Sequence, residues 1–137
     1  MDTMNKIKEI KLVPVTVFNS TDEVVPTLSK LIEGGVPVTE ICFRTDCAFE
    51  AIKLASKEFG DKILIGPGPV INKEQCKQAI MAGAQFIVSP GFSLEVLKVC
   101  RKNNIPYLPG VVTPTEIMNC LDNGINLVKF FPAGVFG

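Results

Sequence analysis

A repeating pattern of a short β-branched segment, a turn rich in glycine or proline, and an amphipathic segment constrains the fold of this chain most strongly. The strand candidates begin roughly every two dozen residues, the length of one strand-plus-helix unit. The six predicted strands cover residues 11–18, 37–43, 62–66, 85–89, 106–109 and 126–131. Strands that alternate with helices predict an α/β fold with a parallel sheet and right-handed crossovers.

Five helices are predicted between these strands. They cover residues 21–33, 47–59, 72–83, 93–102 and 113–124. The last has the clearest start, because Thr113 can act as its N-cap, Pro114 follows, and Glu116 completes a capping box. The first helix stops at Gly34, where a C-terminal glycine is expected.

Such a sheet can remain open and doubly wound, or it can close into a (β/α)8 barrel. No G-x-G-x-x-G follows the first predicted strand, so a dinucleotide-binding open sheet has little support. A complete eight-stranded barrel usually needs roughly 200 residues or more, whereas the predicted units already occupy all 137 residues. The chain is therefore a single domain over residues 1–137, either an open six-stranded sheet or an incomplete barrel.

Lys129 lies in an otherwise apolar predicted strand, where a cation is unusual. Burial disfavours the charged form of a lysine, and a neutral lysine amine can form a Schiff base with a carbonyl substrate. An edge strand with one solvated lysine would show the same pattern. Period-two alternation places Lys129 on the same face as Leu127 and Phe131.

Glu40 is the candidate partner of this lysine. Alternation along the second predicted strand puts Glu40, Cys42 and Arg44 on one face, while Thr45 takes the other. If the first face points into a barrel, Glu40 and Lys129 share its interior. The two could form a simple ion pair or a catalytic pair. A buried ion pair is weak evidence for stability, which favours catalysis.

Three turns rich in glycine and proline follow predicted strands, at residues 66–69, 89–91 and 109–111. Glycine lets a ligand approach the backbone closely, and proline stiffens a turn. Ligands of parallel α/β proteins bind at the C-terminal ends of the strands. We therefore expect these turns to form the rim of a site.

Composition limits the classes of function. The 14 basic and 14 acidic side chains balance, so neither nucleic acid nor an anionic membrane is expected as a partner. The sequence shows no apolar stretch of membrane-spanning length and no signal-peptide core. Five scattered cysteines without any histidine argue against a zinc site and indicate free thiols in a reducing cytoplasm. Acid–base chemistry then falls to Glu, Asp, Lys or Tyr.

Short segments spread over nearly the whole chain resemble the 2-keto-3-deoxy-6-phosphogluconate (KDPG) aldolase family, which includes 4-hydroxy-2-oxoglutarate (KHG) aldolases. They are E-I-C-F-R-T at 40–45, I-G-P-G at 65–68, V-S-P-G at 88–91, P-G-V at 109–111, T-P-T-E at 113–116 and V-K-F-F-P-A at 128–133. The resemblance implies a (β/α)8 TIM barrel of the class I aldolase type, with about six of its eight units present.

The resemblance also implies the roles of individual residues. Lys129 matches the Schiff-base lysine, and Glu40 matches the carboxylate that moves protons. The implied substrate-binding residues are Arg44, Thr45, Pro69, Ser89, Pro90, Gly110 and Phe131. No metal or other cofactor is implied.

The implied activity is reversible cleavage of a 2-keto-3-deoxy-6-phospho sugar acid or of 4-hydroxy-2-oxoglutarate. The products would be pyruvate and an aldehyde, glyceraldehyde 3-phosphate or glyoxylate. The resemblance further implies a cytoplasmic homotrimer of the Entner–Doudoroff pathway. Two other functions remain open: an aldolase-fold scaffold or assembly fragment without phosphate-binding loops, and a related phosphate-binding barrel in which Lys129 only neutralises charge.

The chain departs from the family's pattern at two site positions and at its end. Pro69 stands where the family usually has a threonine that holds the pyruvate end, and Val17 stands where many members have arginine. We expect altered substrate affinity or stereochemical control, with the Schiff base retained. In the family two more strands follow, with phosphate-binding loops, so we expect the native polypeptide to continue beyond Gly137. Alone, these residues would expose two unpaired sheet edges.

Overall fold

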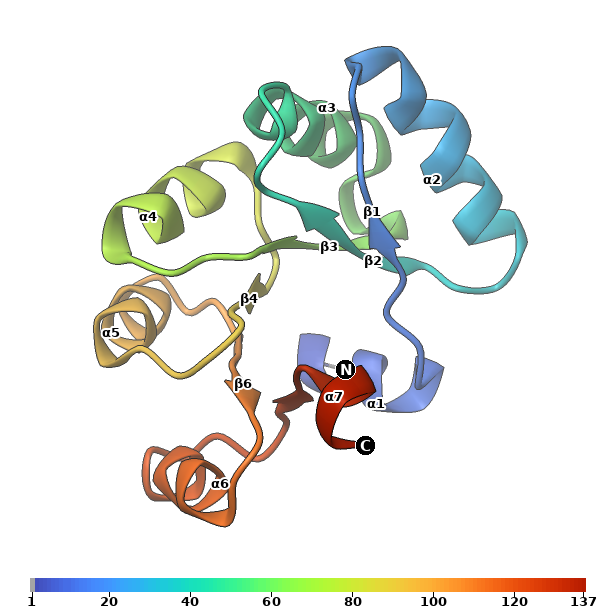
Figure 1. The fold of residues 1–137 in the computed structure, drawn as a ribbon. Helices are drawn as coiled ribbons and strands as arrows, with labels where there is room; N and C mark the ends of the chain where they lie inside the picture. The colour runs from blue at the N-terminus through green and yellow to red at the C-terminus, as the bar shows by residue number, and fades with distance from the viewer. Residues whose placement is uncertain (1) are drawn as a thin grey trace.

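The computed structural model of the protein describes residues 2–137, in which short parallel strands alternate with helices (Figure 1). The helices are α1 (Thr3–Ile10), α2 (Val24–Glu33), α3 (Ala48–Phe59), α4 (Lys73–Ala82), α5 (Leu94–Lys102), α6 (Pro114–Asp122) and α7 (Ala133–Phe136), with the 3-10 turns η1 (Thr21–Glu23) and η2 (Gly60–Lys62). The strands are β1 (Val15–Thr16), β2 (Val38–Cys42), β3 (Leu64–Gly68), β4 (Ile87–Val88), β5 (Tyr107–Leu108), β6 (Gly110–Val111) and β7 (Lys129–Phe130). The predicted α/β alternation is confirmed.

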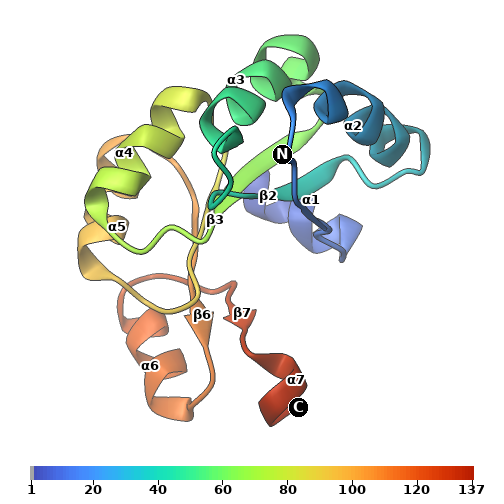
Figure 2. The ribbon, with the colours of Figure 1, turned by 45° about the horizontal axis from the view of Figure 1, so that its top comes forward.

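The strands form one parallel arc. β1, β2 and β3 pair in that order, β4 pairs with β5, and β6 pairs with β7. The amide of Gln85, just before β4, donates to the carbonyl of Ile65 in β3 (2.8 Å) and joins the first group to the second. β5 and β6 are two parts of one segment separated by Pro109, which has no N–H to donate. Helices α2 to α6 lie along the outside of this arc (Figures 1 and 2).

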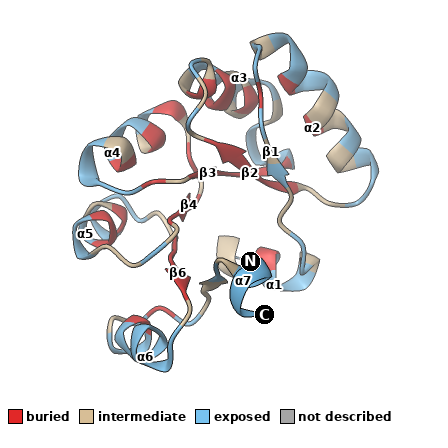
Figure 3. Ribbon diagram, viewed as in Figure 1, coloured by how far each residue is buried: buried red, intermediate tan, exposed pale blue. Residues whose placement is uncertain are grey.

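Buried residues follow the central strands β2 to β6 (Figure 3), and their side chains pack on both faces of the arc. On the outer face, Ile41 and Ile65 pack against helices α2 and α3, and a second outer cluster lies under α4, α5 and α6. On the inner face, the buried cluster consists of Ile7, Val38, Leu64, Phe86, Val88 and Leu108. Since Ile7 belongs to α1, that helix closes the interior where the strands begin. The C-terminal ends of the strands are left for a site.

The helix starts follow the predicted capping pattern. Thr113 Oγ1 accepts from the Glu116 amide (3.3 Å), and the Glu116 carboxylate accepts from the Thr113 amide, which completes the capping box of α6. These hydrogen bonds, first of all the one from the Thr113 backbone, hold the pKa of the Glu116 carboxyl below its ordinary value. Asn72 and Ser93 cap α4 and α5 in the same way.

Helix α1 is absent from the elements predicted from sequence. Its signals are local: Asp2 is the N-cap and accepts from the Asn5 amide (2.8 Å), and Met4, Ile7 and Ile10 all belong to the inner cluster or pack against it. An apolar stripe at this spacing on a short polar segment is a weak helix signal, because such a helix depends on tertiary packing.

Predicted strand boundaries are wrong in several places. The strand predicted at 126–131 is limited to Lys129–Phe130, and Gly110–Val111, predicted as part of a turn, form β6. Residues 11–18 form a strand only at Val15–Thr16, because Lys11 takes a left-handed conformation (φ 62°) as the C-cap of α1. The strand predicted at 62–66 lies at Leu64–Gly68, because η2 extends the end of α3 to Lys62. The shift matters for the site, since it makes Gly68 part of a strand rather than of a turn. None of the helices within residues 2–137 has the length and apolar character needed to cross a bilayer.

Candidate active site

Strand β2 carries the carboxylate of the site. All five of its residues are buried, and successive side chains point to opposite faces. Val38 packs in the inner cluster, whereas Ile41 packs outside against the helices. Glu40 therefore points inward, as alternation predicts, and its side chain is only 10% exposed.

Strand β7 carries the amine. The backbone amide of Lys129 donates to Pro109 O (2.9 Å), and in the parallel register Lys129 lies beside Gly110. Its Nζ lies 3.2 Å from Oε2 and 3.4 Å from Oε1 of Glu40. The same ammonium lies 5.0 Å from the centroid of the Phe131 ring, a cation–π distance. The fold thus brings together two residues 89 positions apart in the chain.

The pair lines a cavity of about 430 Å³ at the C-terminal ends of the strands. The lining residues are Val15, Val17, Glu40, Cys42, Arg44, Gly68, Pro69, Ile71, Ser89, Pro90, Lys129 and Phe131. Within residues 2–137 the Arg44 guanidinium has no carboxylate within 4.0 Å, so it can bind an anionic group of a ligand. The cavity combines one amine, one carboxylate and one unpaired guanidinium with mostly apolar walls.

Two glycines make this arrangement possible. A Cβ on Gly68 would overlap Glu40 Oε1, so the carboxylate occupies space that any larger residue would fill. A Cβ on Gly110 would overlap the carbonyl of Pro90, which rests directly on β6. Both positions therefore need glycine for close approach, and the reason is packing rather than backbone conformation.

Seven of the nine residues predicted for the site line this single cavity. They are Lys129, Glu40, Arg44, Pro69, Ser89, Pro90 and Phe131. Thr45 is not among the lining residues, because it lies on the other face of its segment, where its hydroxyl is 3.8 Å from the Cys47 sulfur. Gly110 supports Pro90 from behind without lining the cavity. The Ser89 hydroxyl already donates to Val70 O, which leaves its lone pairs for a ligand.

Five further residues line the cavity: Val15, Val17, Cys42, Gly68 and Ile71. The sequence singled out Val17 as a departure from the family's pattern, and signals existed for Cys42, which shares a face with Glu40, and for Gly68, which belongs to a predicted rim turn. Val15 and Ile71 carry no chemical signature, so only the fold identifies them.

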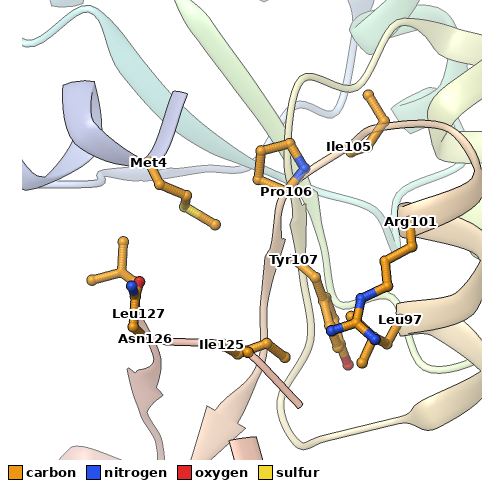
Figure 4. A pocket seen from close by; sticks show the side chains of 10 residues that line it. Met4, Leu97, Arg101, Ile105, Pro106, Tyr107, Ile125, Asn126 and Leu127 are labelled. Carbon is orange, nitrogen blue, oxygen red and sulfur yellow. The ribbon is translucent and has the colours of Figure 1, made fainter. Parts of the chain in front are cut away.

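A second, smaller cavity of about 210 Å³ lies near the N-terminal ends of β5 and β7 (Figure 4). Met4 and Leu127 border one part of it, and Leu97, Arg101 and Tyr107 border another. It contains no lysine or carboxylate. This cavity therefore lacks the groups that carry chemistry at the first one.

The cysteines do not form a metal site in the described part of the chain. All five are free thiols, as predicted, and Cys76 and Cys100 lie with their sulfurs 3.6 Å apart between α4 and α5. No group of three or more His, Cys, Asp or Glu side chains in residues 2–137 has an arrangement that could hold a metal ion.

A primary amine beside a carboxylate, in a cavity with an unpaired guanidinium, suits a substrate that has both a carbonyl and a carboxylate. The fold and the site together define a class of protein: a parallel β/α fold of the barrel type with a part-buried lysine–glutamate pair at the C-terminal ends of its strands. The sequence profile of the KDPG and KHG aldolase family matches residues 3–137. The chain belongs to this family.

Individual relatives support this assignment to the family. The chain is 41% identical over 131 residues to a 2-dehydro-3-deoxy-phosphogluconate aldolase of Treponema pallidum. The alignment covers 96% of this chain and 62% of that relative. It is 40% identical over 126 residues to a KHG/KDPG aldolase of Escherichia coli, covering 92% of the chain and 59% of the relative. The structure superposes with a TM-score of 0.85 on a KDPG aldolase of Legionella pneumophila that was captured with pyruvate as a covalent carbinolamine intermediate. The two chains are 39% identical, and the superposition covers 91% of this chain and 60% of the Legionella pneumophila chain.

The solved relatives confirm the TIM-barrel fold class, and the chain spans about three fifths of the length of the relatives it matches.

Proposed function

We propose that the protein is a class I aldolase that reversibly cleaves a 4-hydroxy-2-oxo acid to pyruvate and an aldehyde. The observation that carries this proposal is the 3.2 Å contact between Lys129 Nζ and Glu40 Oε2 inside the cavity. The names of the relatives, and the pyruvate carbinolamine of the Legionella pneumophila enzyme, support it. Membership of the family alone would not assign these two residues to their roles.

In the proposed complex the substrate carboxylate pairs with Arg44, which has no carboxylate partner within residues 2–137. The C2 carbonyl then lies near Lys129, between the apolar surfaces of Pro90 and Phe131. Binding orients the carbonyl for attack and excludes water from it.

Lys129 attacks C2 once its proton has passed to Glu40, which gives a carbinolamine. Glu40 then returns the proton to the carbinolamine hydroxyl, which leaves as water and gives an iminium ion, so Glu40 is again a carboxylate. The iminium accepts the electron pair of the C3–C4 bond as that bond breaks, so the products of this step are an enamine and an aldehyde. Glu40, directly or through one water molecule, takes the proton of the C4 hydroxyl as the aldehyde leaves. Protonation of the enamine at C3 and hydrolysis of the resulting iminium release pyruvate and regenerate the amine. The iminium is itself the electron sink, so these steps require no cofactor.

The proposed substrates are a 2-keto-3-deoxy-6-phospho sugar acid and 4-hydroxy-2-oxoglutarate, which yield glyceraldehyde 3-phosphate and glyoxylate respectively. The relatives named for KDPG alone and for both KHG and KDPG support both substrates. We further propose a cytoplasmic homotrimer that acts in the Entner–Doudoroff pathway, with residues 1–137 as a single domain. Partners are then limited to the 2-keto acid and pyruvate.

The test is a retro-aldol assay that couples released pyruvate to lactate dehydrogenase, with each of the two substrates in turn. We expect turnover with at least one of them and none with Lys129→Arg, which keeps the cation but cannot form the iminium. Turnover by the Lys129→Arg protein would contradict the proposed role of the lysine. A ratio of the two kcat/KM values would then identify the preferred substrate.

The second candidate is an assembly role for the aldolase fold without catalysis. The observation that favours it is the exposure of apolar side chains at both ends of the strand arc: Val15 is 59% exposed on β1, and Phe130 is 46% and Val135 is 75% exposed at β7 and α7. Apolar surface on unpaired sheet edges is typical of an interaction surface. A folded protein that forms a stable assembly but neither turns over substrate nor binds pyruvate covalently would support this second function.

A further inference from the structure

The loop of residues 89–93 leads from β4 to α5 and forms one wall of the cavity. Pro90 lines the cavity, and Ser93 caps α5. The start of the loop is fixed by the Ser89 amide, which donates to Leu108 O (3.1 Å). Pro90 has no N–H with which to hold itself in place. The position of this wall therefore depends on what fixes the rest of the loop.

Tyr107 on β5 reaches this loop from outside the cavity. Its hydroxyl donates to Gly91 O (3.2 Å) and accepts from the amide of Ser93 (3.1 Å), so it binds the loop on both sides of Phe92. The Tyr107 residue is only 5% exposed, and its ring belongs to the same buried cluster as Leu97 of α5, beside which Figure 4 shows it. The ring centroids of Phe92 and Tyr107 are 6.4 Å apart. A rigid, buried ring thus presents one hydroxyl to two loop groups.

The Tyr107 phenol keeps its proton, which it needs in order to donate to Gly91. Burial raises the pKa of Tyr107 above its ordinary value of 10.0. Without the hydroxyl, the Gly91 carbonyl and the Ser93 amide would both lose the bond that ties them to the buried Tyr107 ring, although Gly91 itself is exposed and Ser93 is half-buried.

The loop is also in direct contact with the strand that holds the amine. Pro90 rests on Gly110, where a Cβ would overlap the Pro90 carbonyl. Gly110 is in turn the register partner of Lys129. A displacement of the loop therefore changes the wall immediately beside the amine.

We infer that Tyr107 is a positioning residue for the proposed reaction. Its hydroxyl fixes residues 89–93, so that Pro90 forms the surface against which the pyruvate end of the substrate lies when it reacts with Lys129. Tyr107 does not touch the substrate, and the inference rests on the proposed function.

The test compares Tyr107→Phe with Thr113→Ala. The first variant removes the hydroxyl and keeps the ring in its cluster. The second removes a helix cap from α6, outside the cavity, and so serves as a control for lost stability. Covalent capture of pyruvate by borohydride reduction is measured as a function of pyruvate concentration, together with hydrogen exchange of the Ser93 amide.

For Tyr107→Phe we expect the half-saturating pyruvate concentration to rise about tenfold, while the capture rate at saturation changes by less than about threefold. The Ser93 amide, which donates to the Tyr107 hydroxyl, should exchange faster, and Thr113→Ala should show neither effect. Unchanged half-saturation in Tyr107→Phe, or an equal change in Thr113→Ala, overturns the inference. If the parent protein captures no pyruvate, the proposed function fails, and unchanged exchange in Tyr107→Phe then overturns the anchoring of the loop as well.

Discussion

Replacement of Gly68 by alanine is expected to separate the Glu40 carboxylate from Lys129 without removing either residue. A Cβ on residue 68 would overlap Glu40 Oε1 and would lie 3.0 Å from Val88 Cβ. Val88 is only 1% exposed in the inner cluster, so it cannot move aside easily. The carboxylate must move instead. Because Oε2 is already 3.2 Å from Nζ, a shift of about 1 Å breaks this hydrogen bond.

The expected effect on chemistry is large. A misplacement of about 1 Å at a reacting centre can reduce a rate by about 100-fold, so capture of pyruvate by Gly68→Ala should slow by that factor. Overpacking should also reduce the free energy of unfolding by about 1–3 kcal/mol. The assay is the initial rate of borohydride-trapped adduct, measured beside a urea unfolding curve.

Two other glycines separate these effects. The three atoms nearest to a Cβ on Gly66 all belong to the Phe86 ring, so Gly66→Ala overpacks the same interior by displacing that ring. Gly134 has no neighbouring atom within 4 Å of its Cβ position, so Gly134→Ala is a neutral control. We expect Gly66→Ala to lose stability with little change in capture rate. Capture at the parent rate by folded Gly68→Ala would refute the reasoning, as would equal slowing in Gly66→Ala.

Three further predictions concern the pair, the core and a helix cap. Glu40→Gln removes the proton acceptor but keeps the shape of the side chain, so turnover should fall by about 10²–10⁴-fold while the circular dichroism spectrum is retained; full activity would exclude Glu40 as the base. Leu28→Ala should lower the free energy of unfolding by about 2–5 kcal/mol, because Leu28 lies on the buried side of α2 (0% exposed). Met81→Ala, at a residue 79% exposed, should change it by less than about 0.5 kcal/mol in the same titration. Thr113→Ala should cost about 1 kcal/mol at neutral pH. The pKa of Glu116 is lowered in the folded protein, so the capping box stabilises the folded state at pH values above the ordinary carboxyl pKa of 4.5. This stabilisation is lost as the pH falls through the lowered value. A loss of unfolding free energy in Thr113→Ala that grows in acid would contradict this sign.

Much of the fold could be predicted because its signals are local. The α6 capping box depends on two residues three positions apart, and alternation along β2 depends only on the pleat of one strand. These local rules predicted the helices and placed Glu40 on one face with Cys42 and Arg44, but the fold decides that this face points inward. Helix α1 escaped prediction because a helix of 8 residues forms only against the interior that it closes.

The site was predictable in its chemistry but not in its walls. Lys129 and Glu40 stand out as charges in apolar strands, and alternation assigns each to one face of its strand. Their 3.2 Å separation depends on how β2 and β7 lie within the arc, which no local rule supplies. The aliphatic walls, and the space that Gly68 leaves for the carboxylate, follow from packing between distant segments. Thr45 shows the limit of motif matching, because a residue inside a matching segment can still face away from the cavity.

The central claim is that Lys129 forms a Schiff base with a 2-oxo acid. The most direct measurement treats the folded protein with pyruvate and borohydride, digests it, and maps the modified peptide by mass spectrometry. The account predicts one reduced pyruvate on Lys129, its loss in Lys129→Arg, and a slower reaction in Glu40→Gln. A folded protein that captures no pyruvate, or captures it on a different lysine, would contradict the account.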